Sequence, residues 1–150
     1  MPGRHLRGVR EVELGQPAAT PTVRRMSREL LLTVSALVAV PVGVFAAAFP
    51  RRLLASKGVA PNTAAEIWVR EVGVMIIATG LVAFLVRGEP NSPALRAVLI
   101  GNAVVQFGLL PIEVIALARG AITKVSGIVP NTALHVVLTA CFGYYAITMG

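Results

Sequence analysis

The stretch Glu66-Ile67-Trp68-Val69-Arg70-Glu71 carries three charges and leads directly into the apolar run 72–86. An ionised side chain in hydrocarbon costs roughly 2.5–3.5 kcal/mol on insertion scales, so a helix that only spans a membrane would avoid these charges. The pattern therefore predicts a membrane helix whose charged beginning belongs to a polar site.

The composition around this stretch is that of an integral membrane protein. Of the 150 residues, 55% are hydrophobic and 14% are charged, which is more apolar than an ordinary soluble domain. The net charge is +7, and six arginines precede Leu30, namely Arg4, Arg7, Arg10, Arg24, Arg25 and Arg28. No structured nucleic-acid motif accompanies them, so we expect them to touch anionic lipid and to bind no specific nucleic acid.

The chain divides near residue 28. Prolines and glycines among charges predict a basic, disordered arm over residues 1–27, with Met26 as an alternative translation start. Apolar runs over residues 28–150 predict an all-α, polytopic membrane four-helix bundle with up-down-up-down connections. The expected helices are 30–49, 64–86, 93–118 and 132–149.

Each expected helix follows a start signal. Side-chain oxygens of Ser, Thr and Asn satisfy the free N–H groups of a first helical turn, and a Glu three residues after the cap completes a capping box. The expected caps are Ser27, Thr63 in a box with Glu66, Ser92 before Pro93, and Asn131.

Small residues repeat every fourth position of the first helix, at Ser35, Ala39, Gly43 and Ala47. Such a stripe permits close approach of a neighbouring helix. A cleaved secretory signal is the competing interpretation, because arginines, an apolar run and the small residues 46–48 also fit a signal peptide. We favour a retained helix, since a discarded signal needs no packing stripe.

Basic residues near the helix ends predict the orientation of the bundle. With the N-terminus inside, the inner segments hold the six arginines of the arm together with Arg87 and Arg96. The outer segments hold Arg51, Arg52, Lys57, Arg119 and Lys124. The excess of inner positive charge favours cytoplasmic positions for both termini.

Polar residues inside the expected helices gather at one depth. Asn102, Gln106 and Glu113 lie within about 60° of one another around the third helix. The start of the second helix, the end of the third and the start of the fourth share one membrane face. This places Arg70, Glu71, Glu113 and His135 roughly 6–12 Å inside it. Intramembrane charges usually turn inward and pair, so the pattern predicts an intramembrane polar pocket.

The residue types of this pocket indicate acid–base chemistry. We expect Glu113 to act as general acid or base and Glu71 as the second carboxylate, with Arg70 paired to one of them. His135, which titrates near neutrality, would orient a substrate together with Asn102 and Gln106. Asn102 and Gln106 also have a structural interpretation, as hydrogen-bonded bridges between helices. Trp68 would contact the substrate in the catalytic interpretation and anchor the helix at the membrane interface in the structural one.

No cofactor or metal is expected. A metal site from Glu71, Glu113 and His135 is conceivable, but no ligand spacing such as His-Glu-x-x-His or Cys-x-x-Cys accompanies these residues. Cys141 is the only cysteine, so the chain has no internal disulfide, and its apolar surroundings predict a small hydrophobic role.

The residues Trp68-Val69-Arg70-Glu71-x-Gly73, Gly80, Arg96-Ala97, Asn102 and Tyr144-Tyr145 resemble the small DoxX-like four-helix membrane proteins of bacteria. The resemblance covers roughly residues 64–148. It implies the fold and a bacterial cytoplasmic (inner) membrane, and it transfers no catalytic residue. The long basic arm departs from the compact members of that family.

Two functions of different classes follow from these observations. In the first, the pocket binds a lipophilic small molecule from the bilayer and acts on it as an acid–base isomerase, cyclase or epoxide-opening enzyme. In the second, the chain is a non-catalytic membrane subunit, a partner of another membrane protein or of its own copies, whose buried charges only fix helix packing. Transport is less favoured, because four helices without an internal repeat rarely form an alternating-access carrier.

Overall fold

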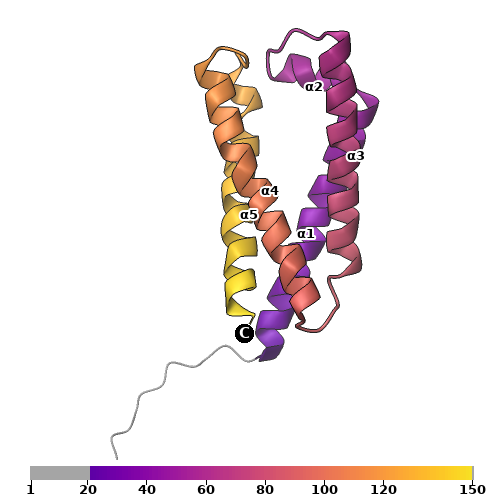
Figure 1. Ribbon diagram of the computed structural model, residues 1–150, viewed down its shortest axis with the longest axis vertical. Helices are drawn as coiled ribbons and strands as arrows, with labels where there is room; N and C mark the ends of the chain where they lie inside the picture. The colour runs from indigo at the N-terminus through magenta and orange to yellow at the C-terminus, as the bar shows by residue number, and fades with distance from the viewer. Residues whose placement is uncertain (1–20, 150) are drawn as a thin grey trace, which may run out of the picture.

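The computed structural model describes residues 21–149, with side chains from Ser27 onward. Its elements in chain order are α1 (Pro21–Ala48), α2 (Pro50–Ser56), α3 (Thr63–Leu85), α4 (Pro93–Ala118), the 3-10 helix η1 (Val125–Gly127) and α5 (Val129–Thr148). Figure 1 shows the long helices running in alternating directions along one axis. The expected all-α bundle is therefore confirmed.

Four helical segments are long and apolar enough to cross a membrane: Ser27–Ala48, Thr63–Leu85, Pro93–Ala118 and Val125–Thr148. Several hydroxyl groups inside these segments donate to a carbonyl one turn earlier in their own helix, as Thr79 does to Met75 at 2.9 Å. These hydroxyl groups are thus satisfied without water, as a bilayer requires. The chain is a multi-pass integral membrane protein.

The first helix begins earlier than its apolar run. α1 starts at Pro21, so Ser27 lies inside the helix and the expected cap there is wrong. The segment 21–27, expected within the arm, is helical, and the remainder of the arm lies outside the described residues. Proline suits a first helical turn, and arginine is a good helix former, so the helix continues beyond the hydrophobic residues.

Caps decide the starts of α3 and α4. The side chain of Asn62 accepts a hydrogen bond from the backbone N–H of Ala65 at 2.9 Å, so the expected cap at Thr63 is wrong by one residue. Asparagine caps at least as well as threonine. For α4, the expected cap is confirmed, because Ser92 Oγ accepts from the N–H of Leu95 at 3.2 Å.

The last helix and the first loop also differ from expectation. α5 starts at Val129, which puts Asn131 in the first turn rather than at the cap, and frees its side chain for a contact with another helix. The loop after α1 contains the short helix α2, with Pro50 in its first turn. A seven-residue helix leaves too few turns for a sequence periodicity to reveal.

The long helices contact one another chiefly as two pairs, α1 with α3 and α4 with α5. Small residues bring α1 and α3 together: a Cβ added at Gly73 would lie 2.6 Å from the backbone nitrogen of Ala47 and 2.7 Å from the carbonyl oxygen of Gly43. The expected close approach along the stripe of α1 is confirmed, and its partner is α3 of the same chain.

Both pairs meet at the end of the bundle where α1 begins and α5 ends, here called the Arg28 end (Figure 1). An apolar core joins all four helices there, with Leu32, Ala83, Leu99 and Phe142 among its buried members. The buried side chain of Arg28 donates to the carbonyl of Glu89 at 2.6 Å and to the side chain of Asn91, which ties α1 to the α3–α4 turn.

The pairs meet again at the opposite end, here called the Lys57 end. The carbonyl of Lys57 accepts hydrogen bonds from the N–H groups of Thr123 and Lys124, both at 3.2 Å. Thr123 Oγ1 donates to the carbonyl of Gly58 at 2.9 Å. The turn after α2 is therefore bonded to the loop after α4, and this brings Lys57 over the second helix pair.

Candidate functional site

Glu113 is the centre of a polar cluster inside the α4–α5 pair. The residue is buried, with 6% of its surface exposed. One carboxylate oxygen accepts from Lys57 Nζ at 3.1 Å and from the Asn131 amide, while the other accepts from Thr132 Oγ1 at 2.6 Å. Three donors from two other parts of the chain thus hold both oxygens.

Lys57 supplies the positive charge for this buried carboxylate. Its ammonium group forms an ion pair with Glu113 at 3.1 Å, and its side chain is 22% exposed against 8% for the glutamate. A buried carboxylate without a partner is costly, because hydrocarbon and protein solvate charge poorly. The bonded turn after α2 therefore places a cation where the end of α4 needs one.

His135 continues the cluster toward the middle of the bundle. Its Nε2 lies 3.0 Å from the Asn131 amide nitrogen, and its Nδ1 bonds to Gln106 Oε1. The ionised Glu113 only accepts, so Asn131 presents its NH₂ group, whose second hydrogen then points at Nε2. Nε2 must accept, so the proton of a neutral imidazole lies on Nδ1 and is donated to Gln106.

The Glu113 cluster is defined here as Lys57, Gln106, Glu113, Asn131, Thr132 and His135. Its bonds form a continuous path from the Lys57 end to Gln106, which lies seven residues or roughly 10 Å further along α4. Both oxygens of the acid and both nitrogens of the imidazole are occupied by protein groups.

The structure brings some of the expected site residues together and separates others. Gln106, Glu113 and His135 join one cluster, whereas Arg70 and Glu71 lie exposed on α3. Arg70 donates to the carbonyl of Ala47 at 2.8 Å, at the end of α1. Arg70 was expected to pair with Glu71 or Glu113, and the Glu113 alternative is wrong: the cation at Glu113 is Lys57, because α3 packs chiefly against α1 through its glycines.

The remaining expected residues lie outside the cluster. Asn102 is buried, and its amide donates to the carbonyl of Val98 one turn earlier in α4 at 2.9 Å. Trp68 is 66% exposed on the outer face of α3, where an aromatic side chain meets lipid headgroups. Glu66 pairs with Arg51 at 2.7 Å, so the expected capping box is wrong.

Three cluster residues were missed by the sequence argument, and signals for them existed. They are Lys57, Asn131 and Thr132. Asn131 lies four residues before the predicted His135, on the same side of the helix, and Thr132 follows it in the same turn. Lys57 belongs to the loop that the alternating helices place on the same membrane face. Asn131 was overlooked because it was expected to cap its helix, and Lys57 was overlooked because Arg70 was expected to supply the positive charge.

Among residues 21–149, no group of three or more His, Cys, Asp or Glu side chains is placed to hold a metal ion. Glu71 is exposed on α3, so it does not join Glu113 and His135. Comparison with models of protein families, with curated proteins and with solved structures found no match to this chain. The fold and the site define the class of the protein: a multi-pass membrane bundle with a hydrogen-bonded polar cluster in one half of it.

Proposed function

We propose that the chain is a non-catalytic membrane subunit, whose polar cluster fixes the packing of its helices so that it can assemble with other membrane protein chains. The observation that supports this is the enclosure of Glu113: Lys57, Asn131 and Thr132 donate to both of its oxygens, and only 6% of the residue is exposed. A carboxylate in this arrangement holds helices in register, and its burial leaves little surface from which it could take a proton from a substrate.

Acid–base catalysis on a lipophilic substrate is the second candidate, and the roles predicted for Glu113, Glu71, Arg70 and His135 belong to it. It is favoured by a buried carboxylate and a buried imidazole on neighbouring helices, which are linked by the amide of Asn131. It also requires the Glu113 cluster to open when substrate enters. The DoxX-like family, a bacterial inner membrane and cytoplasmic termini stay predictions under both candidates.

The two candidates differ in what Glu113→Gln does to stability. A register-fixing role predicts that this variant unfolds several degrees below the wild type in detergent, because Gln cannot accept from all three donors or pair with Lys57. The abundance of the assembled complex, followed on native gels of membranes, should fall with it. Glu71→Gln is the matched control, because it makes the same change at an exposed position and should alter neither quantity.

The opposite result would support catalysis. If Glu113→Gln keeps the wild-type unfolding temperature and complex, and only turnover of a lipophilic substrate is lost, the proposal of a non-catalytic subunit is wrong.

A further inference from the structure

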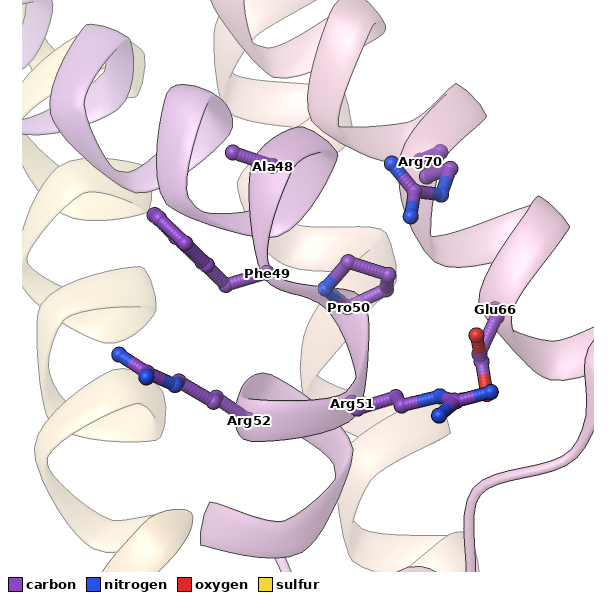
Figure 2. A pocket seen from close by; sticks show the side chains of 7 residues that line it. All are labelled: Ala48, Phe49, Pro50, Arg51, Arg52, Glu66 and Arg70. Carbon is purple, nitrogen blue, oxygen red and sulfur yellow. The ribbon is translucent and has the colours of Figure 1, made fainter.

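A second polar feature lies at the Lys57 end, on the opposite helix pair from the Glu113 cluster. A hollow of about 410 Å³ opens where α1 ends, α2 begins and α3 passes. Its lining includes Phe49, Pro50, Arg51, Arg52, Glu66 and Arg70. Figure 2 shows Arg51 reaching from α2 to Glu66 on α3, with Arg70 deeper along α3 and the Pro50 ring between the two arginines.

The hollow carries an excess of positive charge. Three arginines line it against one glutamate, and that glutamate is already paired with Arg51 at 2.7 Å. Arg70 donates one N–H to the carbonyl of Ala47. A guanidinium has five N–H donors in a fixed fork, so Arg51 and Arg70 each retain donors beyond these bonds. Such forks match the oxygens of a phosphate group.

The hollow also lies at the edge of the membrane-spanning segments. The first span ends at Ala48, immediately before Phe49, which is 47% exposed. Trp68, two residues from Arg70, is 66% exposed on the same helix. An exposed Trp near the end of a membrane helix marks the headgroup region of a bilayer, and the phosphates of lipids lie at this depth.

We propose that this hollow binds the phosphate group of an anionic phospholipid, with Arg51 and Arg70 as the side chains that hold it. Arg51 approaches from α2 and Arg70 from α3, so a phosphate between them would join the two elements that flank the end of α1. Arg52 has a different partner, since its guanidinium lies 5.2 Å from the ring centroid of Phe49. In Figure 2 it points away from Arg51.

The test measures lipid binding to the full chain in neutral detergent by native mass spectrometry. Phosphatidylglycerol is titrated against phosphatidylcholine, which has the same phosphate but no net charge. We expect phosphatidylglycerol to bind about tenfold more tightly, and Arg51→Gln or Arg70→Gln to remove about that factor, as the loss of one charge-assisted hydrogen bond would. Arg119→Gln is the matched control, because Arg119 is an exposed arginine at the same end of the bundle but outside the hollow, and it should change nothing.

Each alternative result has a definite meaning. If Arg51→Gln and Arg70→Gln bind phosphatidylglycerol as the wild type does, or if Arg119→Gln weakens binding equally, the proposed site is wrong. If inorganic phosphate binds as tightly as the lipid, the site takes free phosphate and the lipid assignment is wrong. Arg70 also holds the end of α1, so unfolding temperatures without lipid are compared first. If Arg70→Gln is unstable, Arg51→Gln carries the test, because the Arg51 side chain is 77% exposed.

Discussion

At the scale of single residues, Glu113 shows how a membrane protein keeps a charge buried. Its three donors come from the turn after α2 and from the first turn of α5, so the carboxylate holds parts of the chain that are 56 and 18 or 19 residues away in sequence. Removing one donor leaves the other bonds but raises the cost of the buried charge. The contributions of the cluster residues to the free energy of unfolding should therefore be strongly coupled.

A double-mutant cycle measures this dependence. Lys57→Met alone leaves a buried carboxylate without its cation, and Glu113→Gln alone leaves a partly buried ammonium group without its anion. We expect each to lower the free energy of unfolding by about 1–3 kcal/mol and the double variant to lose less than the sum, with a coupling of about 0.5–3 kcal/mol. Reversible chemical unfolding in detergent gives these values. Additive losses would mean that the 3.1 Å ion pair contributes nothing.

The hydrogen bonds of His135 can be tested separately. His135→Asn shortens the side chain, so it cannot reach both Asn131 and Gln106, which lie on opposite sides of the imidazole. We expect a loss of about 1–3 kcal/mol, because the amides of Asn131 and Gln106 are left without this partner in partly buried positions. Gln106→Leu removes one of these bonds and should cost less. Equal stability of His135→Asn and the wild type would contradict the hydrogen-bonded path described here.

At the scale of helices, glycine decides which helix is the neighbour of α1. Gly43 and Gly73 face each other, and Gly80 lies against Ala39, whose Cβ would be 2.9 Å from a Cβ added at Gly80. In a bilayer, helices associate through close packing rather than through escape from water. The stripe on α1 is thus covered by α3, so a partner chain must use another surface.

Gly73→Ala tests this interface. The added methyl group would clash with the backbone of α1 at Gly43 and Ala47, and neither backbone atom can move aside alone. We expect a loss of about 1–3 kcal/mol in the free energy of unfolding. Gly101→Ala is the matched control in α4, where a Cβ meets nothing within 4 Å. It should be neutral or stabilise the helix by up to about 1 kcal/mol. Equal effects of the two variants would show that the α1–α3 contact is loose.

At the scale of the whole molecule, the bundle consists of two helix pairs joined at both ends. The Arg28 end is joined by an apolar core and the Lys57 end by bonded turns. Gly58 is central to the contact between the two turns at the Lys57 end. Its φ of +71° is unfavourable for other residues, and a Cβ there would meet Thr123 Oγ1. The apolar contacts at the Arg28 end tolerate small shifts, whereas the hydrogen bonds at the Lys57 end depend on the geometry of two turns.

Gly58→Ala should open the Lys57 end alone. Spin labels at the exposed positions Ile67 on α3 and Val129 on α5 should give a longer and broader distance distribution in this variant, with Cys141 replaced by serine in all samples. Labels at Leu85 and Ile147, at the Arg28 end, should not change. Gly120→Ala is the matched control, because Gly120 has a φ of +69° but open space around it. A similar change in both variants would assign the effect to backbone strain and not to the contact between the two turns.

The four long helices, their spans and the polar face of α4 could be read from the order of the amino acids, because hydrophobic length and a period of 3.6 residues are local properties. The common depth of Glu113 and His135 also followed, since alternating helices place known ends on one face. The stretch from Glu66 to Glu71 was less informative than its charges implied. The membrane face near which this stretch lies could be predicted, but the helix that packs against it could not.

Which helices pair, and hence which cation meets Glu113, became clear only in three dimensions. Arg70 and Lys57 both lie near the same membrane face, and their positions along the chain do not distinguish them. The glycine contacts of α3 turn Arg70 toward the end of α1, and the bonded turns bring Lys57 to Glu113. Packing between distant segments decides such pairings, because it depends on side-chain shape across an interface and not on any pattern within one segment.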